Sequence, residues 1–141
     1  MKLSPTEIYK NKNIFFIGGT GFVGKVALSM LLKNFPDVGR VYMIVRARNQ
    51  EESLNRFWNS VVPSPTFDPI RGVHGDKFEE FIREKLIPIN GDVSADFLGM
   101  EETQAKEIMA ECDVIINSAG NVTFNPPLES ALRTNVVGTN N

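Results

Sequence analysis

Short apolar runs alternate with amphipathic segments along the whole chain. Runs rich in β-branched and aromatic residues predict strands at 13–17, 41–45, 87–90 and 113–117. Apolar residues at helical spacing predict helices at 22–34, 51–62, 76–86 and 101–111, and Pro127 opens a further helix. The stretch at 71–75 has no clear period, and we expect an irregular loop there.

The strands are apolar along their length instead of alternating, which is typical of parallel strands covered on both faces. Their alternation with helices predicts an α/β fold with a doubly wound parallel sheet. The last predicted helix is still running at 136–141, so we expect a domain truncated after its fourth strand and the following helix. Such a truncation would expose the apolar helix face of Leu128, Leu132 and Val136.

The composition is that of an ordinary globular domain, with 42% hydrophobic and 23% charged residues. A net charge of −2 gives no electrostatic footprint for nucleic acid. Apolar runs are far shorter than the roughly 20 residues of a transmembrane segment, and the N-terminus has no secretory core. We therefore expect a cytoplasmic protein, and the sequence leaves its oligomeric state open.

A glycine-rich turn directly follows the first predicted strand and opens the first helix. Gly18, Gly21 and Gly24 form the pattern G-x-x-G-x-x-G. Gly18 allows the tight turn, Gly21 lets the backbone approach a pyrophosphate, and Gly24 lets helix and strand pack closely. The helix N-terminus offers free N–H groups for phosphates, although a glycine turn without a ligand is the alternative.

This turn predicts a Rossmann fold, with 1–141 as the N-terminal part of one NAD(P)-binding domain whose remainder is absent. The residues of the turn that we assign to the cofactor are Gly18, Thr20, Gly21, Phe22, Val23 and Gly24.

The end of the second strand selects the cofactor. An NAD-binding domain usually has a carboxylate there for the ribose 2′-hydroxyl, but here Arg46 and Arg48 follow, with no acid before Glu51. A guanidinium suits a 2′-phosphate. We predict NADPH, held by Arg46 and by Arg56 from the following helix, with Arg48 a weaker candidate; the alternative is that these arginines are solvated surface residues.

Polar and small residues follow the other two strands. We expect Asp92 to accept the adenine amino group and Val93 to pack on the ring, unless Asp92 instead caps the next turn. Ser118, Ala119 and Gly120 leave room for the backbone to approach the second ribose and the nicotinamide, unless they form only a tight turn.

Four other side chains have less specific patterns. Asn135, inside the last helix, either organises the active site or hydrogen-bonds a neighbouring backbone. His74 is expected to be solvent-exposed, and Trp58 to be a core residue. Cys112 is the only cysteine, which excludes an internal disulfide and leaves a metal site unsupported.

These motifs resemble the extended short-chain dehydrogenase/reductase superfamily in its thioester-reductase branch, and are most similar to fatty acyl-CoA reductases. The resemblance spans essentially the whole chain and rests on segments 18–24, 45–48, 89–93, 114–124 and 135–139. It implies NADPH-dependent reduction of fatty acyl-CoA thioesters to a fatty aldehyde or alcohol, in lipid metabolism. In related reductase domains a second arginine ten residues further on also serves the 2′-phosphate, which matches Arg56.

The superfamily's catalytic Tyr-x-x-x-Lys pair is missing. Tyr9 and Tyr42 are followed four positions later by Asn13 and Arg46. The resemblance thus implies that no catalytic residue lies in this chain, that the pair lies beyond Asn141, and that the isolated chain is inactive.

Two alternatives stay open. One is the reductase domain of a carboxylic acid reductase or peptide synthetase, although Met1 shortly before the first strand favours a stand-alone reductase. The other is a non-catalytic NADP(H)-binding protein. Acyl length, product, and CoA versus carrier-protein thioester are not determined by these residues.

Overall fold

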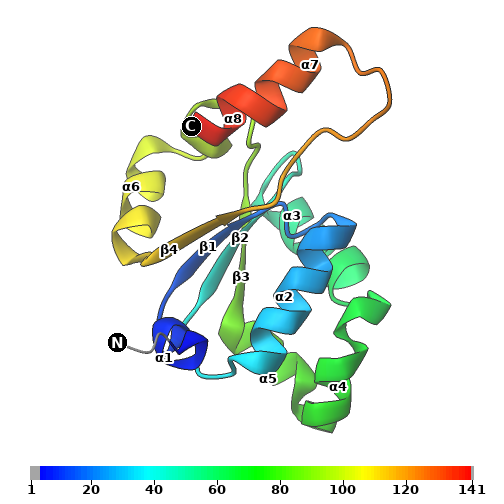
Figure 1. Cartoon of the computed structure of the whole chain (residues 1–141), viewed down its shortest axis with the longest axis vertical. Coiled ribbons are helices and arrows are strands. Elements are labelled where there is room, and N and C mark those ends of the chain that lie inside the picture. Colours follow the sequence, from blue (N-terminus) through cyan, green and yellow to red (C-terminus); the bar gives the residue numbers. More distant parts are fainter. Residues whose placement is uncertain (1–3, 141) are drawn as a thin grey trace.

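A parallel β-sheet runs through the centre of the molecule in the computed structural model, which describes residues 4–140 (Figure 1). Its strands are β1 (Ile14–Ile17), β2 (Val41–Val45), β3 (Leu86–Asn90) and β4 (Val114–Asn117). They lie in the order β3-β2-β1-β4, and each neighbouring pair is parallel. The chain winds outward to β3 and then crosses to the other side of β1, which confirms the doubly wound topology.

Helices and shorter helical turns connect the strands. The α-helices are α1 (Pro5–Tyr9), α2 (Phe22–Asn34), α3 (Gln50–Arg56), α4 (Asp68–His74), α5 (Phe78–Lys85), α6 (Glu102–Glu111), α7 (Leu128–Leu132) and α8 (Gly138–Asn140). The π turns are η1 (Phe57–Val61) and η5 (Arg133–Val137), and the 3-10 turns are η2 (Pro65–Phe67), η3 (Gly75–Lys77) and η4 (Asp96–Gly99).

The central strand β1 feeds two separate cores. Ile14 and Phe16 enter the larger core, which α2, η1, α4 and α5 cover, whereas Phe15 and Ile17 enter the smaller core under η4 and α6. Successive residues of a strand point to opposite faces, so a strand that is buried on both faces carries only apolar side chains. The expected burial is confirmed for β1 and β2, but in β4 Ile115 is 62% exposed.

The helix expected at 51–62 changes its winding halfway. The Val62 N–H donates to the Phe57 carbonyl five residues earlier, which makes η1 a wider π turn. The buried face runs through Ser53, Phe57 and Val61, whereas Leu54 is exposed.

The loop expected at 71–75 is wrong, because α4 extends to His74 and η3 follows it. Two glycines in this stretch hide the helical pattern. Arg71 donates to the carbonyls of Val62 and Ser64 and so holds α4 against the end of η1, although glycines lower the helix propensity of this stretch. The half-buried His74 ring stacks on Phe81 of α5 with the ring centroids 3.9 Å apart, so His74 is a packing residue.

Strand β3 forms one edge of the sheet, and a side chain covers part of that edge. The Gln50 amide donates to the Pro88 carbonyl (3.0 Å) and accepts from the Asn90 N–H (2.8 Å). The N and O atoms of a strand residue point to the same side, so the Pro88 nitrogen faces away from β2 and the proline removes no bond from the ladder.

Replacing Gln50 should weaken this edge. Gln50→Ala loses both contacts to β3, and we expect the free energy of unfolding to fall by about 1 kcal/mol. Gln50→Glu keeps an acceptor for Asn90 and loses the donor to Pro88, so its loss should be smaller. Urea unfolding followed by circular dichroism measures both, and equal stability of Gln50→Ala and the parent would contradict this role.

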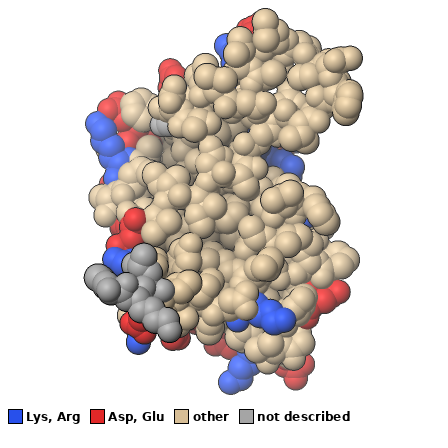
Figure 2. All heavy atoms as spheres, viewed as in Figure 1, with Lys and Arg blue, Asp and Glu red and all other residues tan. Residues whose placement is uncertain are grey.

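The segment after β4 exposes its apolar side chains. Val122 and Phe124 are 93% and 97% exposed. Leu128, Leu132 and Val136 are exposed as well, as expected for the last helix. Figure 2 shows a mostly uncharged surface over the top of the molecule, with acidic and basic atoms at its upper edge, where Figure 1 places α7 and the loop before it. No helix within residues 4–140 is long and apolar enough to cross a bilayer.

Candidate cofactor site

A pocket of about 280 Å³ opens where the four parallel strands end. In doubly wound sheets ligands bind at the carboxyl ends of the strands, at the point where the strand order reverses. Here that point is β1, which has β2 on one side and β4 on the other. The pocket is lined by Ile17, Gly18, Thr20, Gly21, Ile44, Arg46, Arg56, Gly91, Asp92, Val93, Ser118, Ala119, Gly120 and Thr134.

The predicted site residues line this pocket with the exception of Phe22, Val23, Gly24 and Asn135. The structure therefore brings together residues from four strand ends, while their individual contacts with a cofactor stay predictions. Sequence reasoning missed Ile17, Ile44, Gly91 and Thr134. Ile17, Gly91 and Thr134 each adjoin a predicted residue, but Ile44 carried no such signal.

The three motif glycines differ in whether the fold leaves room for a side chain. A Cβ on Gly18, whose φ is +89°, would lie 2.5 Å from the Ala119 nitrogen, and one on Gly24 would lie 2.1 Å from the Gly18 carbonyl oxygen. Both glycines are required by the fold, in agreement with the turn and packing roles expected of them. A Cβ on Gly21 would meet only the Gly18 oxygen at 3.4 Å, which is ordinary contact. The fold therefore tolerates a side chain at Gly21, and the space it would fill lies in the pocket.

The N-terminus of α2 faces this space without a cap of its own. Gly21 is the N-cap residue, no side chain caps the helix, and its first turn contains no acidic residue. Phe22 and Val23 expose their side chains to solvent, so what they can offer the pocket is backbone N–H groups. Uncapped N–H groups and the positive end of the helix dipole favour an anion such as phosphate.

A larger residue at Gly21 should block the ligand and spare the fold. Gly21→Val is expected to weaken dinucleotide binding strongly while the circular dichroism spectrum stays that of the parent. The control Gly24→Val pushes its side chain into the Gly18 carbonyl and should destabilise the protein. Calorimetric titration with NADPH provides the measurement, and parent-like affinity in folded Gly21→Val would refute the assignment.

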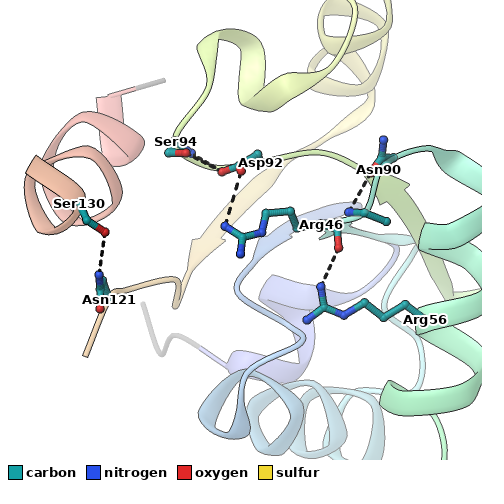
Figure 3. Close-up of polar contacts among 8 residues, drawn as sticks. Arg46, Arg56, Asn90, Asp92, Ser94, Asn121 and Ser130 are labelled. Carbon is teal, nitrogen blue, oxygen red and sulfur yellow. Dashed lines mark hydrogen bonds and ion pairs between the residues drawn. The ribbon is translucent and has the colours of Figure 1, made fainter. Parts of the chain in front are cut away.

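Charged side chains from β2, β3 and α3 meet on one side of the pocket (Figure 3). Arg46 Nη1 lies 3.6 Å from Asp92 Oδ2, and Arg56 Nη1 donates to the Arg46 carbonyl oxygen at 2.6 Å. Asp92 Oδ1 accepts from the backbone N–H and the hydroxyl of Ser94, at 2.9 and 2.7 Å. Asp92 thus caps the turn after β3, which was the alternative to an adenine contact, and its Oδ2 still faces the pocket.

Asp92 is ionised at neutral pH. Partial burial raises the pKa of its carboxyl group, but the hydrogen bonds from Ser94 and the charge of Arg46 outweigh burial, so the pKa lies below its ordinary value. The pocket therefore contains one carboxylate opposite two guanidinium groups.

Arg48 does not take part in this arrangement. Its side chain forms an ion pair with Glu52 on α3, with Arg48 Nε donating to Glu52 Oε2 at 2.9 Å. Of the three arginines considered from the sequence, only Arg46 and Arg56 line the pocket.

Asn135 supports the pocket from the π turn η5 without lining it. Its side-chain oxygen accepts from the Asn121 N–H at 2.7 Å, and its side-chain nitrogen donates to the Asn121 carbonyl at 3.2 Å. Asn121 in turn donates to the Ser130 hydroxyl (Figure 3). Of the two roles considered, the structure shows hydrogen bonding to a neighbouring backbone, which fixes the chain directly after Gly120.

Neither tyrosine reaches the pocket. Tyr9 packs on Phe35, and the Tyr42 hydroxyl donates to Glu111, which together with burial raises the pKa of Tyr42. Burial likewise raises the pKa of the Cys112 thiol, so it is a packing residue without reactive-thiolate character. Within residues 4–140 no cluster of His, Cys, Asp and Glu is suited to a metal ion.

The parallel sheet, the glycine turn before α2 and the pocket at the strand ends define a Rossmann-type domain of the class that binds dinucleotides. The chain belongs to the NAD-binding family described as "Male sterility protein", whose family model matches residues 17–141.

Curated proteins from plants and animals are similar to this chain in sequence. The chain is 36% identical over 139 residues to "Fatty acyl-CoA reductase 2, chloroplastic" of Arabidopsis thaliana, covering 99% of this chain and 23% of that protein. It is 35% identical over 137 residues to "Fatty acyl-CoA reductase 1" of Mus musculus, covering 97% of this chain and 25% of that protein. The chain thus spans about a quarter of the length of these relatives.

Solved reductase domains share the fold. The terminal R domain from the myxalamid PKS-NRPS biosynthetic pathway superposes with a TM-score of 0.69 at 25% identity, covering 92% of this chain and 30% of that chain. The reductase domain of a nonribosomal peptide synthetase from Mycobacterium tuberculosis gives a TM-score of 0.63 at 24% identity, covering 83% and 26%. These likenesses confirm the expected Rossmann-like architecture.

Proposed function

We propose that this chain is the NADPH-binding part of a fatty acyl-CoA reductase, an oxidoreductase that acts on acyl thioesters. The observation that carries the proposal is the identity of about one residue in three, over nearly the whole chain, to proteins named fatty acyl-CoA reductases in a plant and a mammal. The pocket at the strand ends gives this likeness a physical basis, because its residues suit a dinucleotide.

The residues present fit the cofactor. Gly21 leaves an open space in front of an uncapped helix N-terminus, which suits the pyrophosphate. Arg46 and Arg56 stand where an NAD-specific domain would have a carboxylate, and a guanidinium there suits the 2′-phosphate of NADPH. Val93 offers an apolar contact to adenine, and the small residues after β4 leave the backbone accessible to the nicotinamide half.

NADPH, when bound, supplies the hydride for the reduction. The thioester carbonyl gains this hydride and a proton to give a hemithioacetal, which loses free CoA and leaves an aldehyde. A second hydride and proton convert the aldehyde to an alcohol. In this chain the helix N-terminus and the arginines hold the phosphates, and Asn135 keeps the segment after β4 in place for the end where the chemistry occurs.

Arg46 should determine the preference for NADPH over NADH. Loss of a charge-assisted contact to the 2′-phosphate costs about 1.5–3 kcal/mol, or roughly 10- to 150-fold in affinity. Arg46→Ala in the full-length enzyme is therefore expected to raise the KM for NADPH by this factor and to change that for NADH little. The matched control is Arg48→Ala, whose guanidinium is held by Glu52 outside the pocket. Equal losses for both cofactors would make Arg46 a structural residue.

The 141-residue chain alone should not reduce a thioester. Reduction needs a proton donor within hydrogen-bond reach of the carbonyl oxygen, and in residues 4–140 both tyrosines are engaged away from the pocket. We expect the purified chain to bind NADPH more weakly than the full-length enzyme does, and to show no heat-labile oxidation of NADPH with palmitoyl-CoA. Turnover of palmitoyl-CoA by this chain would overturn the assignment of catalysis to residues outside it.

A further inference from the structure

We infer that Asp92 sets how strongly the pocket prefers a 2′-phosphorylated nucleotide, because its carboxylate competes with the 2′-phosphate for Arg46. The inference rests on the proposed NADPH site and assigns to Asp92 a function beyond an adenine contact. Asp92 and Arg46 follow adjacent strands, β3 and β2, and their ion pair at 3.6 Å reaches across one side of the pocket (Figure 3).

The carboxylate is the fixed partner of this pair. Both the backbone N–H and the hydroxyl of Ser94 donate to Asp92 Oδ1, and the side chain is 35% exposed. Its second oxygen therefore stays beside the pocket whether or not Arg46 is there.

The guanidinium is the movable partner. The backbone around Arg46 is held on both sides, since Arg56 donates to the Arg46 carbonyl and the Ala47 N–H donates to Asn90 Oδ1 at 3.1 Å. The Arg46 side chain beyond that backbone is 73% exposed, and Asp92 is its ion-pair partner in the described residues. The arginine can thus turn from the carboxylate to a ligand without any change in the strands.

A 2′-phosphate changes the balance between these two partners. An exposed ion pair is weak, whereas a phosphate carries more charge and accepts two parallel guanidinium hydrogen bonds. The phosphate therefore takes Arg46, but it loses the energy of the Arg46–Asp92 pair and lies near a carboxylate that is no longer neutralised. A nucleotide without a 2′-phosphate leaves the pair intact, so the competition lowers affinity only for the phosphorylated ligand.

Asp92→Asn isolates this effect. The amide keeps the size of the side chain and an oxygen for the Ser94 donors, and it removes the charge. Adenosine 2′,5′-bisphosphate and adenosine 5′-monophosphate, titrated into this chain by NMR or calorimetry, measure the discrimination as the ratio of the two dissociation constants. We expect Asp92→Asn to increase the discrimination in favour of the bisphosphate about two- to fivefold, the range of an exposed ion pair. In an Arg46→Ala background the same substitution should leave the ratio unchanged.

The possible outcomes distinguish a failure of the Asp92 competition from a failure of the proposed NADPH site. If the parent chain binds both nucleotides equally, the proposed NADPH site is rejected. If the parent prefers the bisphosphate and Asp92→Asn leaves that preference unchanged or reduces it, the competition is rejected and the NADPH site stands. If Asp92→Asn weakens both nucleotides by the same factor, Asp92 is an adenine contact alone and the competition is again rejected. A loss of fold is detected by circular dichroism, and Ser94→Ala then provides the second measurement, because it removes the hydroxyl donor to Asp92 Oδ1 and keeps the backbone donor and the charge. Loss of this donor leaves more of the negative charge to compete for Arg46, so a lower preference for the bisphosphate supports the inference, and an unchanged or higher preference rejects it.

Discussion

The approach of α2 to the turn after β1 is the contact on which the rest of the site depends. A Cβ on Gly24 would lie 2.1 Å from the Gly18 carbonyl oxygen. Only glycine at this position therefore allows the helix to start so close to the strand. This contact aims the uncapped N-terminus of α2 at the carboxyl end of β1. Gly21 lies between Gly18 and Gly24 in the motif and is therefore placed beside the pocket. The packing of the protein would accept a larger residue than glycine at this position.

The parallel arrangement of the strands gathers distant parts of the chain at this helix terminus. All four strands end at the same edge, so the residues that follow them become neighbours. The Ser118 N–H and hydroxyl, for example, both donate to the Ile17 carbonyl, although the two residues are 101 positions apart. Burial on both faces keeps β1 and β2 free of charged residues, so the charged groups of the site stand on the connections after the strands.

The sequence predicted those features that depend on local patterns. The bounds of α2 and β2 agree with prediction. Gly21 and Pro36 flank the apolar residues at helical spacing in α2, and β2 is one continuous buried run that starts shortly after Gly39. The winding of η1 and the helix α4 were not predictable in this way, since they depend on packing and on Arg71, which joins α4 to carbonyls that precede it. Thr134 was missed for a similar reason, because only the position of η5 in the fold brings it to the pocket.

The charged residues of the pocket also could not be understood one at a time from the sequence. From the sequence, Arg46 and Asp92 receive separate ligand atoms, one at the ribose and one at the adenine. In the structure the two side chains form an ion pair, because β2 and β3 are neighbours with Val45 paired to Asn90. Arg46 is the first residue after β2 and Asp92 the second after β3, so both lie at the same edge of the sheet. A ligand that binds one of them therefore alters the electrostatic environment of the other. This coupling is a property of the strand order, and no motif within either segment contains it.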